Sequence, residues 1–153
     1  MVQSVSVPLF ITASICLLLS LFFILLYHRL TSRHEESVKY YFIFSVAALV
    51  SSVFFGGFAM LVNASDNLFY LSISNRITVI AAMFTTVLSL HFYVAFFQYK
   101  APTFLQWCYV ICAAFSLLAV VPNQYFLANT FFATSQYYTG LAYGPLFQLW
   151  GGW

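Results

Sequence analysis

Two ionisable side chains, Arg76 and His91, lie within the apolar stretch from Ile73 to Gln98 and are the best candidates for chemistry in this sequence. An ionisable group at membrane depth normally faces a protein interior or a wet cavity instead of lipid. On a helix that turns by about 100° per residue, both side chains share one arc. The guanidinium could hold an anionic or polar group of a ligand. For His91 two interpretations stay open, a hydrogen bond to a neighbouring helix and a switch or ligand contact.

A second cluster of potential ligand atoms lies in the segment 28–39, which contains His28, His34, Glu35 and Glu36. Their spacing matches no metal-binding template, so we expect a solvated loop there. The three cysteines all lie within apolar stretches, where thiols usually behave as small hydrophobic groups. We therefore predict no metal, no cofactor and no disulfide framework.

Serine hydroxyls offer no catalytic centre in this sequence. Ser45, Ser52 and Ser89 lie at helix-packing positions, without a plausible base and orienting acid beside them. The net charge of +2 is too small and too dispersed to indicate nucleic-acid binding. We therefore expect neither an enzyme nor a nucleic-acid-binding protein.

The composition places these residues on membrane-spanning helices. Hydrophobic residues make up 63% of the chain and charged residues only 5%, whereas a soluble domain carries about 25% charged residues. Each span needs about 20 apolar residues, so 153 residues suit about four spans. We predict an all-α integral membrane protein, residues 1–153 forming one transmembrane region. The predicted spans of this four-helix bundle are about 9–27, 41–62, 73–98 and 104–121.

Basic residues predict the orientation of the bundle. Three of the five, Arg29, Arg33 and Lys39, lie in or beside the loop after the first span, and Lys100 follows the third span. Cytoplasmic loops carry the excess of lysine and arginine. We therefore predict an N-terminus outside the cytoplasm, with Arg76 close to the outer surface.

Small residues recur at steps of three and four on two of the spans. Such residues let neighbouring helices approach closely. We predict that they form helix-packing seams, although the pair Gly56-Gly57 could also act as a hinge. The seam residues are Ser45, Ala48, Ser52 and Gly56 on the second span and Ala82, Thr85 and Ser89 on the third.

The last segment, 123–153, has no charged residue and is roughly one-third aromatic. Tyrosine and tryptophan favour the membrane interface, so we predict an extracytoplasmic cap with a short hairpin through residues 130–138. Two interpretations stay open, an aromatic anchor and a wall over an apolar ligand. In the second, the predicted ligand-binding residues are Asn75, Arg76, Tyr138, Tyr143 and Trp150.

Three features together resemble the N-terminal seven-helix sensor region of bacterial histidine kinases. They are the basic loop after the first span, the span ending LSLHFYVAFFQYKAP and the outer segment ending TGLAYGPLFQLW. The resemblance implies an external N-terminus, a bacterial inner-membrane location and a cytoplasmic kinase or cyclase output domain. This chain would supply the first four helices and the outer connector of such a sensor.

Two functions follow as hypotheses. The first is a membrane-embedded sensory region that detects a small or lipid-like ligand and relays it to a missing output domain. Ligand binding would bias two packings of the helices, with His91 as a candidate switch. The alternative is a small transport or assembly subunit without signalling output. The expected partners are the lipid bilayer, a small apolar or anionic ligand, and either a second copy or a C-terminal signalling domain, but no nucleic acid.

Overall fold

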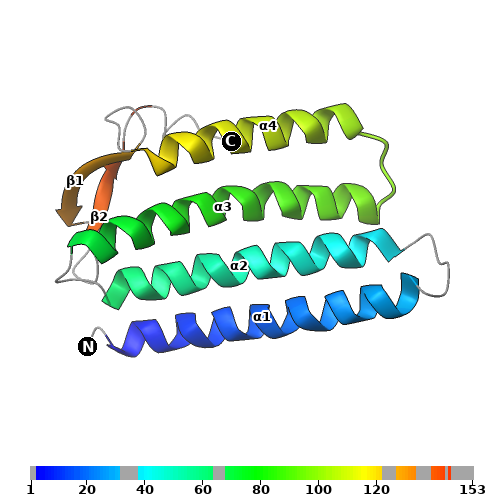
Figure 1. Cartoon of the computed structure of the whole chain (residues 1–153), viewed down its shortest axis with the longest axis horizontal. Helices are drawn as coiled ribbons and strands as arrows, with labels where there is room; N and C mark the ends of the chain where they lie inside the picture. Colours follow the sequence, from blue (N-terminus) through cyan, green and yellow to red (C-terminus); the bar gives the residue numbers. More distant parts are fainter. Residues whose placement is uncertain are drawn as a thin grey trace.

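A computed structural model describes residues 3–31, 38–63, 68–121, 127–133, 139–143 and 145 of the chain. Four long helices carry the fold, and two short strands follow them (Figure 1). The helices are α1 (Gln3–Thr31), α2 (Lys39–Asn63), α3 (Leu68–Phe96) and α4 (Pro102–Val120). The strands are β1 (Leu127–Ala133) and β2 (Thr139–Tyr143).

All four helices are long and apolar enough to cross a bilayer, so the chain is a multi-pass membrane protein. This confirms the predicted all-α membrane fold and its four spans. The helices differ from the predicted spans by a few residues at their ends. Helices α1 and α2 extend beyond the predicted spans at both ends, whereas α3 and α4 begin and end earlier than predicted.

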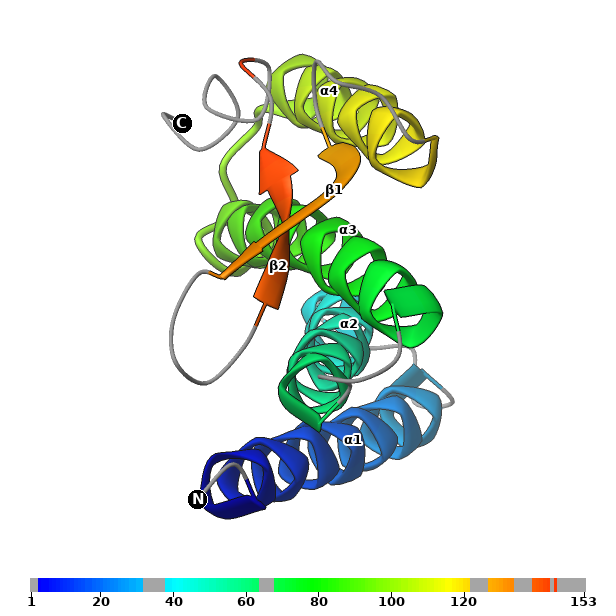
Figure 2. The ribbon, with the colours of Figure 1, turned by 90° about the vertical axis from the view of Figure 1, so that its left-hand side faces the viewer.

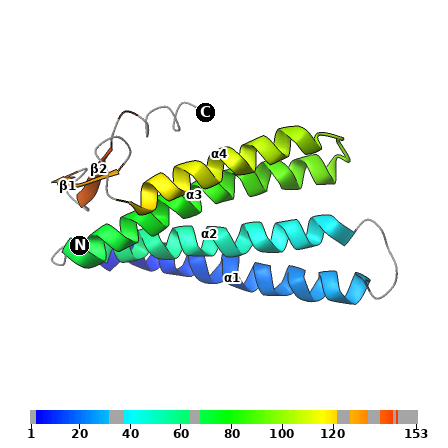
Figure 3. The same ribbon diagram turned by 45° about the horizontal axis from the view of Figure 1, so that its top comes forward.

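The helices form an open row in which each packs mainly on its neighbour in sequence (Figures 1 and 2). Helices α1 and α4 lie at the two edges of the row, with α2 and α3 between them. Helix α3, which carries Arg76 and His91, therefore has a neighbouring helix on each side. The start of α1, the end of α4 and the strands lie at one end of the row, and the α3–α4 turn lies at the other (Figure 3). The direction in which the row crosses the membrane stays a prediction.

Serine hydroxyls join α1 to α2 along the predicted seam. The Ser45 hydroxyl donates to the Ser20 carbonyl oxygen at 2.8 Å, and the Ser52 hydroxyl donates to the Ala13 carbonyl oxygen at 2.8 Å. Ala48, between the two serines, is buried. Interhelical hydrogen bonds and small side chains are the means by which helices associate in lipid. The packing role predicted for Ser45, Ala48 and Ser52 is confirmed.

The prediction for Gly56 was wrong, because its neighbour Gly57 is the close-packed glycine of α2. A Cβ added at Gly57 would lie 2.7 Å from the Thr78 Oγ1 atom of α3. A Cβ added at Gly56 would meet no atom of the described chain within 4 Å. Gly56 continues the arc of Ser45 and Ser52, which faces α1, whereas Gly57 lies about 100° further round the helix and faces α3.

The seam predicted on α3 lies partly buried in the row. Ala82, Thr85 and Ser89 are each half-buried. Ser89 lines a small cavity together with residues of α1 and α2, among them Cys16 and Ala48. The side chain of Ser89 therefore faces the α1–α2 pair, as the small-residue pattern predicts.

A tight turn ends α3 and starts α4. The Tyr99 amide donates to the Val94 carbonyl at 2.9 Å and the Gln98 amide to the Ala95 carbonyl at 3.2 Å, the bond pattern of a Schellman cap. Gln98 takes the left-handed conformation that this cap requires, with a φ of 57°. Pro102 then begins α4, where its missing amide donor costs nothing.

Strands β1 and β2 pair antiparallel beside the N-terminal end of α3 (Figure 2). The register pairs Phe131 with Leu141, and an irregularity separates that pair from the Leu127–Tyr143 pair. A hairpin was predicted for this part of the chain. The strands occupy 127–133 and 139–143, and residues 134–138 between them lie outside the described residues.

Candidate functional site

Helix α3 contacts α4 with one face and α2 with the opposite face. The arc that Arg76 and His91 share faces α4, and Met83 also contacts α4. On the other side, Thr78 faces α2 at Gly57. The arc of Arg76 and His91 is therefore an interhelical surface, and the α3–α4 interface brings together both ionisable residues of the span.

At the hairpin end of this interface, Arg76 holds the last turn of α4. Its Nη1 atom donates to the Ala119 carbonyl oxygen, and it lies 3.5 Å from the Val120 carbonyl oxygen. The last four carbonyls of a helix lack partners within the helix and carry partial negative charge. A guanidinium therefore stabilises this helix end and ties α4 to α3.

Asn75, next to Arg76, is the least satisfied polar side chain near this end. It is only 2% exposed, and its Nδ2 atom has no hydrogen-bond partner within the described part of the chain. By helical geometry it lies on the side of α3 between Thr78, which faces α2, and Val79, which packs towards α4. A buried donor without an acceptor costs about 1–3 kcal/mol, so this position favours a bound acceptor.

The other predicted ligand-binding residues come from the segment after α4. Tyr143 ends β2, the strand that packs on α3, so the fold brings its backbone to the end of the molecule that holds Asn75 and Arg76. Tyr138 and Trp150 lie outside the described residues. Of the three residues predicted to form the aromatic wall, the structure therefore places only Tyr143, and only its backbone.

At the opposite end of the interface, His91 is hydrogen-bonded to α4. Its Nδ1 atom lies 2.9 Å from the Tyr109 hydroxyl, and the two rings meet edge to face at 5.7 Å. This confirms the first of the two interpretations for His91. Arg76 and His91 are 15 residues apart, so the two polar contacts lie about 22 Å apart along α3.

Beside these contacts, the α3–α4 interface contains an apolar groove of about 250 Å³ that extends past Tyr109 towards the α3–α4 turn. Among the lining residues of the groove, Thr86 carries a hydroxyl group, and this hydroxyl donates to the Ala82 carbonyl oxygen at 3.0 Å. At the bottom of the interface, the Ser116 hydroxyl lies 3.8 Å from the Met83 sulfur. The groove is lined by Met83, Thr86, Val87 and Leu90 of α3 and by Phe104, Cys108, Ile111, Cys112 and Phe115 of α4.

The α3–α4 pair is the least closely packed of the three consecutive helix pairs. Helices α1, α2 and α3 are joined by small-residue seams, whereas α4 is joined to α3 by a small apolar cluster and two polar contacts beside an open groove. In the described ranges no three His, Cys, Asp or Glu side chains are grouped as a metal site would require. The arrangement is suited to binding and to movement of α4.

Sequence reasoning did not identify Tyr109 as a partner of His91. The signal was present, because both residues lie nine positions from Lys100 in the turn between two antiparallel helices. Residues equidistant from such a turn lie at similar depths, since both helices rise by about 1.5 Å per residue.

Comparisons with protein-family models, with curated proteins and with solved structures found no match.

Proposed function

We propose that this chain is a membrane-embedded sensory region in which α4 is the moving element. The observation that supports the proposal is the contrast between the closely packed α1–α2–α3 unit and α4, which packs less closely on α3 through a small apolar cluster and two polar contacts, one at its last turn and one near its middle. A signalling element needs two packings of similar free energy. A helix that packs less closely on its neighbour, and is joined to it partly by replaceable hydrogen bonds, meets that requirement better than one held by a small-residue seam.

In this proposal the ligand binds at the hairpin end of α3. The buried Nδ2 atom of Asn75 donates a hydrogen bond to an acceptor atom of the ligand. The charge of the ligand attracts the guanidinium of Arg76. Tyr143, with Tyr138 and Trp150, contributes the aromatic wall. The ligand is small, and either anionic or lipid-like with a polar head.

The signal then passes along α4 to the turn at the opposite end. A ligand that draws Arg76 away from the Ala119 carbonyl weakens the attachment of α4 at its C-terminal end, while the His91–Tyr109 hydrogen bond acts as a pivot near the middle of the helix. The output domain is cytoplasmic and lies outside these residues, as the resemblance to histidine-kinase sensors implies. The proposed location is a bacterial inner membrane.

Spin-label distance measurements test whether α4 moves separately. One label pair joins the exposed positions Val53 on α2 and Val110 on α4, and a control pair joins Val53 to Leu18 on α1, in a background with the native cysteines replaced. We expect Arg76→Gln to shift or broaden the α2–α4 distances while the α1–α2 distances stay unchanged. Equal and unchanged distributions for both pairs would refute the proposal.

A test in cells addresses the signal itself. In the signalling protein, Arg76→Ala is expected to abolish the response while the amount of chain in the membrane fraction stays at the wild-type level. An unchanged response would remove Arg76 from the sensing mechanism.

The open row favours a second candidate, an assembly subunit without signalling output. The outer faces of both edge helices are apolar and exposed, for example at Leu25 of α1 and Leu117 of α4. Helices of a partner could pack on either edge by the same close contacts that join the row. Purification of a stable hetero-oligomer in mild detergent, with α4 distances insensitive to Arg76→Gln, would favour this candidate over a sensor.

A further inference from the structure

We infer that the groove between α3 and α4 binds an anionic phospholipid of the leaflet that borders the α3–α4 turn. The inference concerns the end of the helices opposite to the proposed ligand site and is independent of the proposed function. It combines three observations: the lining of the groove, its length, and the cation at its end.

The lining of the groove matches a hydrocarbon chain. Eight of its nine lining residues are apolar side chains or thiols, and the ninth, Thr86, satisfies its hydroxyl on its own helix. The groove can therefore make dispersion contacts with a hydrocarbon chain, and it has no lining group that needs a hydrogen bond from the ligand. Its volume of about 250 Å³ exceeds that of an apolar cavity of about 150 Å³, which already accepts benzene.

The length of the groove matches one leaflet of a bilayer. Its lining on α4 runs from Phe104 to Phe115, which corresponds to about 16 Å along the helix. The hydrocarbon core of a bilayer is about 30 Å thick, so one leaflet contributes about 15 Å. An acyl chain that enters at the turn would follow the groove towards the middle of the membrane.

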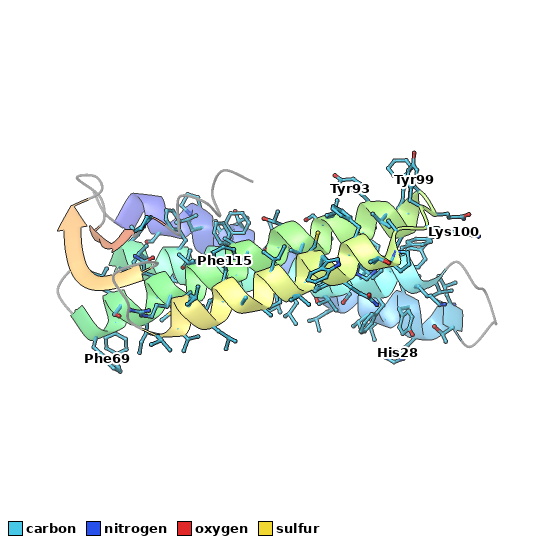
Figure 4. The ribbon with its side chains drawn as sticks, turned by 90° about the horizontal axis from the view of Figure 1, so that it is seen from above. His28, Phe69, Tyr93, Tyr99, Lys100 and Phe115 are labelled. Atoms are coloured by element: carbon cyan, nitrogen blue, oxygen red, sulfur yellow. The ribbon has the colours of Figure 1, made fainter. Side chains whose placement is uncertain are left out.

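The head of this lipid would lie at the α3–α4 turn, where Lys100 provides a positive charge. Lys100 and Tyr99 are exposed and line a second cavity, of about 340 Å³, beneath the turn. In Figure 4 both side chains extend to the same side of α4 as Phe115, which lines the far end of the groove. A lysine at a membrane surface attracts anionic lipids, which specifies the charge of the head group.

Photo-crosslinking of the unmodified chain tests the groove directly. The chain is reconstituted in nanodiscs of phosphatidylcholine with a minor fraction of phosphatidylglycerol that carries a diazirine in its acyl chain. We expect cross-linked peptides to be enriched in residues 83–90 and 104–115 over the lipid-exposed face of α1. Cross-links spread evenly over all lipid-facing helices would overturn the inference.

Two matched pairs of variants separate the acyl chain from the head group. Cys108→Phe fills the groove and is expected to abolish the enrichment, whereas Val110→Phe, on the exposed face of α4, is expected to preserve it. Lys100→Gln is expected to lower the preference for phosphatidylglycerol over phosphatidylcholine about fivefold in competition, the factor that corresponds to roughly 1 kcal/mol per lysine. Lys39→Gln, at the start of α2, is expected to leave it unchanged.

The helical content of Cys108→Phe shows whether this variant folds. If it does not fold, the cross-linking of wild type still tests the inference. An equal yield from phosphatidylcholine and phosphatidylglycerol probes in wild type would overturn the anionic head group. Loss of enrichment in Val110→Phe as well as in Cys108→Phe would overturn the groove as the site.

Discussion

Replacing Gly57 by alanine should destabilise the protein, whereas the same change at Gly56 should stabilise it. The added Cβ at Gly57 would lie 2.7 Å from the Thr78 Oγ1 atom, closer than non-bonded atoms approach. Thr78 is buried, and its hydroxyl donates to the Ser74 carbonyl at 2.7 Å, so it cannot turn away without losing that bond. Overpacking of this kind costs about 1–3 kcal/mol.

The matched change, Gly56→Ala, measures the intrinsic effect of replacing glycine by alanine in this helix. A Cβ there meets no described atom within 4 Å, and alanine is favoured over glycine in a helix by about 1 kcal/mol. The two variants should therefore differ in their free energy of unfolding by about 1–3 kcal/mol, the cost of the overpacking alone. The intrinsic preference for alanine is the same at both positions, so contact with α3 accounts for the difference.

A double-mutant cycle identifies the contact. Thr78→Ala removes the Oγ1 atom that the new Cβ would meet, so Gly57→Ala should cost much less in that background than in wild type. Unfolding is followed by far-ultraviolet circular dichroism as sodium dodecyl sulfate is added to mixed micelles. Stabilisation of wild type by Gly57→Ala, or an unchanged cost after Thr78→Ala, would refute the packing of α2 on α3 described above.

Three further predictions concern the attachment of α4 and use the same unfolding assay. Tyr109→Phe removes the hydrogen bond to His91 and should cost about 1 kcal/mol in wild type but nothing after His91→Phe; equal costs in both backgrounds would contradict the pairing. Arg76→Met removes the donor to the end of α4 and should cost about 1–3 kcal/mol, with Arg76→Lys recovering part of it; a neutral effect of Arg76→Met would exclude the capping role. Gln98→Gly relieves a left-handed conformation and should stabilise by about 1 kcal/mol, and destabilisation would count against the Schellman cap.

The sequence was sufficient for the parts of the fold that depend on one helix at a time. Four apolar runs predicted four spans, because each must cover the same thickness of hydrocarbon. The helical period placed Arg76 and His91 on one arc, and that arc does face another helix. Ser45 and Ser52 were identified as packing residues from their spacing alone, and they contact α1.

The tertiary structure was needed wherever two helices decide a property together. Periodicity could not separate Gly56 from Gly57, because the choice depends on the direction in which α3 lies. The sequence also left open whether Arg76 meets a ligand, water or protein, and the structure places carbonyls of α4 against it.

Hydropathy therefore determined the four membrane-spanning helices of the described residues, and helical period determined that Arg76 and His91 share a face. The pairing of helices in an open row, the loose attachment of α4 and the groove beside it came only from the tertiary structure. The physical reason is that lipid is as apolar as the helix surfaces, so hydrophobicity cannot select a neighbour. That selection depends on close packing and on individual hydrogen bonds between residues distant in the sequence.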